Sequence, residues 1–259
     1  MGHNRLGRLP KTLKWRQVVR LLNDSPADTP AVARAALQAS AVRLRELADD
    51  RSLTECFWLL TRIASASRGT DFDVALSRLG LESEGADSAV AFISRINDRA
   101  RAELALHPES GPFSELASLA LRRALTETVG QEGRSLFGSS LDDLQQAFRR
   151  HATEKQFGIL AHGFFGDFFA RTLRFFVEKE LSNQVGPGHG LESLRASQDF
   201  AASLDLYARQ SASIMEDFAA GWFSKHHWDA KGEISREEAR GFVAVALRKL
   251  RMELVRAEA

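Results

Sequence analysis

The chain has 259 residues, 44% of them hydrophobic, and a formal net charge of +1 at pH 7. This size allows one large helical domain or two small ones, and the near-neutral charge argues against bulk electrostatic capture of nucleic acid. Cys56 is the only cysteine, which excludes an internal disulfide and a cysteine-based zinc site. No run of 18 apolar residues and no signal-peptide pattern occurs, so we expect a cytoplasmic protein without a membrane contact.

The first segment, 1–23, predicts a basic arm that ends in a short helix. Thr12 is the expected N-cap, and Trp15, Val18 and Leu22 lie on the apolar face of the helix. The segment carries no acidic residue, and its basic residues are Arg5, Arg8, Lys11, Lys14, Arg16 and Arg20. Because such side chains pair with phosphates, the arm is a candidate nucleic-acid-binding surface. Docking on an acidic protein and simple solvation are the alternatives.

The next segment, 24–135, predicts an N-terminal helical half. Thr29 and Pro30 open a helix that runs to about Leu47, and Ser52 with Glu55 forms a capping box before the following helix. Three further helices are expected: a short one opened by Thr70 and Asp73 and ended by Gly80, one from Asp87 or Ser88 to Pro108, and one over 113–129. The turn-rich residues 130–140 are the predicted boundary between the halves.

The remaining segment, 136–259, predicts a C-terminal helical half, or the rest of one continuous domain. Helices are expected to start at Ser140 and at Thr153. Positions 200–221 then show a heptad seam, with mostly apolar residues at alternating spacings of four and three that Ser211 and Gly221 weaken. The seam favours a single internal bundle helix over a free coiled coil. A capping box of Ser235 and Glu238 opens the last helix.

The Phe-rich stretch between Phe157 and Phe176 determines the expected architecture. Its rings cover most of a helix circumference, so the helix should be enclosed on nearly all sides. Asp167 with Arg171, and Arg174 with Glu178, are spaced i,i+4 on it and must be paired if they are buried. A polar pocket in the apolar wall is the functional alternative. We predict an all-α bundle of about nine to ten helices around this central helix.

A partner-binding surface is predicted from residues expected outside regular helix. The loop 183–190 and the segment 222–229 combine glycine, proline and aromatic side chains, which are favoured in exposed turns and interface hot spots. The candidate residues are Asn183, Gly186, Pro187, Trp222, His226, His227 and Trp228. The alternative is that the first 20 residues of this chain cover the aromatic rings.

We expect neither a metal nor another cofactor. His226 and His227 are adjacent and point in different directions on a helix, so they are poorly placed to share an ion. The spacing of Gly232 and Glu238 matches an EF-hand loop, but Lys231 stands where that loop needs an oxygen ligand. The motifs of nucleotide-binding loops, serine hydrolases and zinc proteases are absent from the sequence.

Arg101 and His107, separated by five residues, resemble the Arg-x(4–6)-His motif of the HEPN ribonucleases, which are all-α and often toxins or defence effectors. The resemblance implies that the pair acts on an RNA phosphodiester. The polar residue that usually follows the arginine is Ala102 here. A helix-terminal histidine before Pro108 is the structural alternative.

Further stretches resemble uncharacterised helical proteins of bacterial defence and mobile-element neighbourhoods. They are His3-Asn4-Arg5-Leu6-Gly7, Glu180 to Gly188, Phe218 to Trp222 and Ile234 to Ala239. The resemblance implies a bacterial multi-protein system, with anti-phage defence as one such context and a neighbouring gene as the source of the partner. We therefore expect a non-enzymatic accessory, sensor or scaffold subunit, with a HEPN-like ribonuclease and a nucleic-acid-binding protein as alternatives.

Overall fold

A computed structural model describes residues 13–24, 28, 31–36, 38–39, 50–82, 88–106, 112–133, 141–181, 186, 191–229 and 233–256. The helices are α1 (Leu13–Asn23), α3 (Arg51–Ala66), α4 (Phe72–Arg78), α5 (Ala89–Ala105), α6 (Pro112–Glu127), α7 (Val129–Gly133), α8 (Leu141–Arg150), α9 (Glu154–Leu181), α10 (Leu194–Ser211), α11 (Ile214–Asp229) and α12 (Arg236–Arg256). Residues 31–36 are also helical, within the helix expected from Thr29. The all-α fold class is confirmed.

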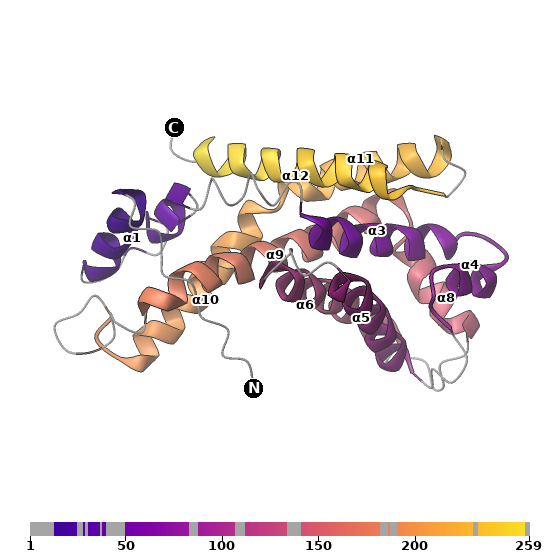
Figure 1. The fold of residues 1–259 in the computed structure, drawn as a ribbon, viewed down its shortest axis with the longest axis horizontal. Coiled ribbons are helices and arrows are strands. Elements are labelled where there is room, and N and C mark those ends of the chain that lie inside the picture. Colours follow the sequence, from indigo (N-terminus) through magenta and orange to yellow (C-terminus); the bar gives the residue numbers. More distant parts are fainter. Residues whose placement is uncertain are drawn as a thin grey trace.

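The Phe-rich helix α9 runs through the middle of the molecule (Figure 1). Its most extensive neighbours are α11, α10 and α6, while α3 packs against α6 and α12. Buried side chains of both predicted halves belong to one hydrophobic cluster. The short helix α1 joins it through Trp15, whose ring lies 5.6 Å from that of Phe176. Among the described residues, no helix has the length and apolar character needed to cross a bilayer.

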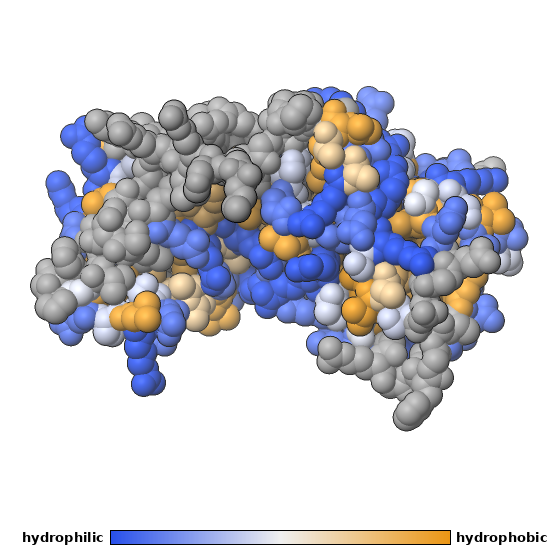
Figure 2. All heavy atoms as spheres, turned by 60° about the horizontal axis from the view of Figure 1, so that its bottom comes forward, coloured by the Kyte–Doolittle hydropathy of each residue, from blue (hydrophilic) through white to orange (hydrophobic). Residues whose placement is uncertain are grey.

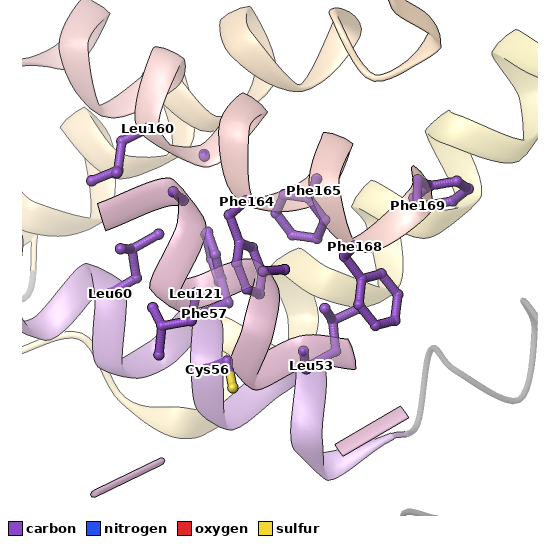
Figure 3. Packing of buried hydrophobic residues seen from close by; sticks show 14 of the residues in the cluster. Leu53, Cys56, Phe57, Leu60, Leu121, Leu160, Phe164, Phe165, Phe168 and Phe169 are labelled. Atoms are coloured by element: carbon purple, nitrogen blue, oxygen red, sulfur yellow. The ribbon is translucent and has the colours of Figure 1, made fainter. Parts of the chain in front are cut away.

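The rings of α9 form the centre of the core, as predicted. Phe164, Phe165 and Phe168 are fully buried. Figure 3 shows Phe57 of α3 among the α9 rings, and its ring centroid lies 5.4 Å from that of Phe165. On its other side Phe57 stacks on Phe242 of α12 at 4.6 Å. Aromatic side chains from three helices thus meet at one point of the core.

Gly158 allows α9 and α11 to approach each other closely. A Cβ atom at this position would lie 2.4 Å from the backbone oxygen of Glu216 and 3.1 Å from the Cβ of Ala220. Gly163, one and a half turns further along α9, is different, because a Cβ there would meet only the Ala124 Cβ at 3.9 Å. The helix contact therefore requires glycine at position 158 and not at position 163.

Both charge pairs predicted on α9 are present, and the Asp167 carboxylate has two further partners. The Asp167 carboxylate is 1% exposed and accepts a hydrogen bond from Arg171 Nε at 2.5 Å. It also pairs with Arg209 of α10 and with Arg123 of α6. Three guanidinium groups from three helices therefore surround one buried carboxylate, which offsets its desolvation. Arg174 pairs with Glu178, as predicted, at 3.7 Å.

Of the capping boxes predicted at the starts of α3 and α12, only the second is present. The capping box of α12 is confirmed: Ser235 N donates to Glu238 Oε2 at 2.7 Å, and Glu238 N donates to Ser235 Oγ at 3.2 Å. The box predicted from Ser52 and Glu55 is wrong. Asp50 is the N-cap and accepts from the Ser52 amide at 2.7 Å. Glu55 takes no part in this cap, and its Oε2 accepts a hydrogen bond from Arg236 Nε of α12 at 2.7 Å.

The heptad pattern over 200–221 belongs to two helices, so the single helix expected there is wrong. The chain turns at Ala212 and Ser213, between α10 and α11. The two amides that follow α10 bond three residues back, Ala212 N to Arg209 O at 3.1 Å and Ser213 N to Gln210 O at 3.1 Å. His162 of α9 also bonds the Arg209 carbonyl at 3.0 Å. This side-chain contact stabilises the end of α10, since the last carbonyls of a helix have no partner one turn further along the chain.

Two other boundaries agree with the sequence. Ser88 is the N-cap of α5, and its Oγ accepts from the Ala91 amide at 3.1 Å. Gly80 follows α4 with φ 70°, a left-handed conformation that favours glycine.

Candidate functional site

The C-terminal end of α11 is helical through Asp229, so the expectation that 222–229 lies outside regular helix is wrong. Trp222 faces the core: its ring lies 5.6 Å from Phe57 and 4.7 Å from Phe242. His226 stacks on Trp222 at 4.6 Å, and its Nδ1 lies 2.9 Å from the Trp222 carbonyl oxygen. Both predicted partner-binding residues are thus half-buried and held by this chain.

His227 connects α11 to α3. Its Nδ1 lies 2.6 Å from Ser65 Oγ, and its ring stacks on Phe223 at 5.7 Å. Burial lowers the pKa of His227, and the positive charge of Arg68 lowers it further. Both effects favour the neutral ring, in which Nδ1 can accept a hydrogen bond from the Ser65 hydroxyl.

Trp228 differs from its neighbours, because 84% of its surface is exposed. It is the most exposed of the large hydrophobic side chains among the described residues. On the face drawn in Figure 2, hydrophobic side chains form small separate patches among hydrophilic ones. Isolated exposed apolar residues are ordinary, but tryptophan is usually highly buried, so an indole in solvent needs an explanation.

A pocket of about 470 Å³ lies beside His227. The end of α3, the connection to α4, α4 itself and the end of α11 form its wall. The charged and titratable groups of this wall are Arg62, Arg68, Arg78, Asp71, Glu233 and His227. Because Trp228 directly follows His227, the exposed indole and the pocket belong to the same end of α11.

The connection that borders this pocket is held by α8. Gln145 Nε2 donates to the carbonyl oxygens of Ser67 and Gly69, at 3.1 and 2.8 Å. Arg149 donates to the Arg68 carbonyl at 3.4 Å. A backbone fixed in this way holds the pocket in a defined shape. The pocket was not predicted from the sequence, where the polar run Arg68-Gly69-Thr70-Asp71 between two helices was the available signal.

The loop candidates are described only in part. Gly186 is half-buried, with φ 135°, which favours glycine. Its amide donates to the Leu191 carbonyl at 2.8 Å. Asn183 and Pro187 lie outside the described residues. The partner-binding role of the loop stays a prediction.

The HEPN candidates are not brought together by a described contact. Arg101 forms an ion pair with Glu115 of α6, and the two side chains are 46% and 53% exposed. His107 lies outside the described residues. The position of one member relative to the other is thus untested, and the ribonuclease alternative stays a hypothesis.

The basic arm is described only from residue 13 onward. Lys14, Arg16 and Arg20 are exposed on α1, opposite the buried face that contains Trp15. Arg5, Arg8 and Lys11 lie outside the described residues. The described part therefore offers three of the six predicted basic side chains to solvent.

Over the described part of the chain, no group of three or more His, Cys, Asp or Glu side chains is placed to hold a metal ion. Lys231 and Gly232, which entered the EF-hand comparison, lie outside that part. Comparison with protein-family models, with curated proteins and with solved structures finds no match to this chain.

Proposed function

We propose that this protein is a non-enzymatic accessory, sensor or scaffold subunit that binds a protein partner through the C-terminal end of α11. Trp228 carries this proposal. Its indole is 84% exposed, while Trp222 and Phe223 of the same helix pack against the core. Tryptophan is enriched among the residues that dominate protein interfaces.

The surroundings of Trp228 also suit a partner contact. His227 is held by Ser65 at 2.6 Å, so the end of α11 is anchored to α3 before any partner arrives. A helix end that is already held in place needs little further ordering when a partner binds. The resemblance to proteins of bacterial defence neighbourhoods supplies the proposed context, a multi-protein bacterial system with a partner encoded nearby.

The test compares two exposed apolar residues. The tagged protein is expressed in its native host, and co-purified proteins are identified for wild type, Trp228→Ala and Leu206→Ala, a control that is 57% exposed on α10. We expect Trp228→Ala to weaken partner binding by about 30-fold or more, the effect of a hot-spot residue. Leu206→Ala should bind as wild type does.

Thermal unfolding of the same variants separates binding from folding. If Trp228 faces solvent, Trp228→Ala should change stability by less than about 0.5 kcal/mol. A large loss of stability would show that this chain covers the indole, and retained partner binding would show that the surface lies elsewhere.

Exposed basic side chains on α1 support a second candidate, nucleic-acid binding by the arm. Lys14, Arg16 and Arg20 share the solvent side of that helix. Binding through phosphates should weaken steeply as salt increases. A titration with single-stranded RNA and duplex DNA at two salt concentrations tests it, and binding that stays equal after all six basic residues of the arm are changed to Gln would exclude this arm.

A further inference from the structure

The pocket beside His227 has the donors of a phosphate site, and we propose that it binds the phosphate group of a small phosphomonoester. Its volume of about 470 Å³ falls within the range of about 300–1,000 Å³ found for small-molecule sites. This ligand is independent of the protein contact proposed for Trp228.

Two arginines of the wall make few or no hydrogen bonds to the described residues, so their N–H donors remain for a ligand. Arg78 forms no hydrogen bond or ion pair within the part of the chain that the structure describes, and its side chain is exposed at the end of α4. Arg68 makes one long hydrogen bond, from Nη1 to the Ala152 carbonyl at 3.5 Å. Guanidinium groups bind phosphate oxygens through paired N–H donors.

His227 supplies a neutral donor to the same wall. When Ser65 donates to Nδ1 across 2.6 Å, the neutral ring carries its proton on Nε2. Nε2 has no partner among the described residues, so this N–H is available to a phosphate oxygen. Ser65 thereby sets the tautomer, which is the role of a positioning residue.

The balance of charge favours a bound anion. Three arginines, Arg62, Arg68 and Arg78, line the pocket with two carboxylates, those of Asp71 and Glu233. Arginines thus outnumber carboxylates in the wall, and Thr70 Oγ1 donates to Asp71 Oδ2 at 3.2 Å, which partly satisfies that carboxylate.

The remainder of the wall indicates an ester and not the free ion. Ala66, Val74 and Ala75 line the pocket together with the polar groups, and Val74 is 51% exposed. An organic group attached to the phosphate could cover these apolar side chains, whereas inorganic phosphate could not.

The test measures the melting temperature with inorganic phosphate, AMP, ribose 5-phosphate or adenosine, at constant ionic strength. We expect the two esters to raise it more than inorganic phosphate does, and adenosine to leave it unchanged. A rise with inorganic phosphate equal to that with the esters would overturn the assignment of an ester, because the organic group would then add nothing to binding. No rise with any of the three phosphates at millimolar concentration would overturn the proposal.

Matched arginine variants locate the binding. Arg78→Gln should weaken ester binding about tenfold to hundredfold, the usual loss for a charge-assisted hydrogen bond. Arg122→Gln changes an exposed arginine of α6 that does not line the pocket, and it should bind as wild type does. Because Arg78 has no described partner, its variant should fold normally. Equal binding by both variants would overturn the proposal.

Discussion

Replacement of Gly158 by alanine tests the packing of the central helix. The new Cβ would lie 2.4 Å from the Glu216 backbone oxygen, and that oxygen belongs to α11. Real Cβ atoms essentially never approach other atoms within 3.0 Å. Relief therefore requires α9 and α11 to move apart, which loosens the stacked pair of Phe157 and Phe223, now 3.9 Å between ring centroids.

The net effect is the difference of two contributions. Overpacking a core costs about 1–3 kcal/mol, and a backbone obstacle places this site near the upper value. Alanine gains about 1 kcal/mol over glycine within a helix. Gly158→Ala should therefore destabilise the protein by about 2 kcal/mol, which lowers the melting temperature by about 4–8 °C in a chain of this size.

Gly163→Ala is the matched control on the same helix. Its Cβ would meet only the Ala124 Cβ at an ordinary 3.9 Å, so the gain in helix propensity remains and stability should rise by up to about 1 kcal/mol. Chemical denaturation of both variants with a circular dichroism readout measures the difference. If Gly158→Ala is as stable as Gly163→Ala, the close approach of α9 and α11 does not exist.

Three further predictions follow from the core and the pocket. Phe168→Ala should cost about 3–5 kcal/mol in denaturant unfolding, because the ring is fully buried; an unchanged midpoint would refute its burial. Asp167→Asn should cost about 3 kcal/mol, because three arginines lose their shared carboxylate, whereas Glu178→Gln, with its 57% exposed side chain, should cost less than about 1 kcal/mol. The pKa of His227 is lower in the folded than in the unfolded protein. The neutral ring therefore stabilises the fold fully above about pH 6.5, and this stabilisation is lost as the pH falls through the folded-state pKa. The stability difference between wild type and His227→Gln should shrink as the pH falls below 6.5, and a difference that does not depend on pH would contradict this.

The sequence predicts the parts of the fold that depend on neighbours in the chain. The rings of α9 and the pair of Asp167 and Arg171 follow from the period of a single helix. Long-range contacts were not predictable in this way. Arg123 and Arg209 reach Asp167 from other helices, and the pairing of Glu55 with Arg236 joins residues 181 positions apart.

The candidate site shows the same limit. Trp228 was among the predicted partner-binding residues, but the sequence did not distinguish it from Trp222, which packs on Phe57 and Phe242. Both lie in one helix whose aromatic residues occupy several faces, so periodicity alone does not say which ring is covered. The pocket brings His227 next to Ser65, across 162 positions of sequence, and only the tertiary structure reveals that contact.

The central claim is that Trp228 contacts a partner protein, and site-specific photo-crosslinking tests it most directly. A photoreactive phenylalanine analogue is placed at position 228 or, as the control, at position 206, and the protein is irradiated in its native host. We predict a crosslink from position 228 to one defined partner protein, and none to that partner from position 206. Crosslinks from position 228 only to other parts of this chain, or the same products from both positions, would contradict the claim.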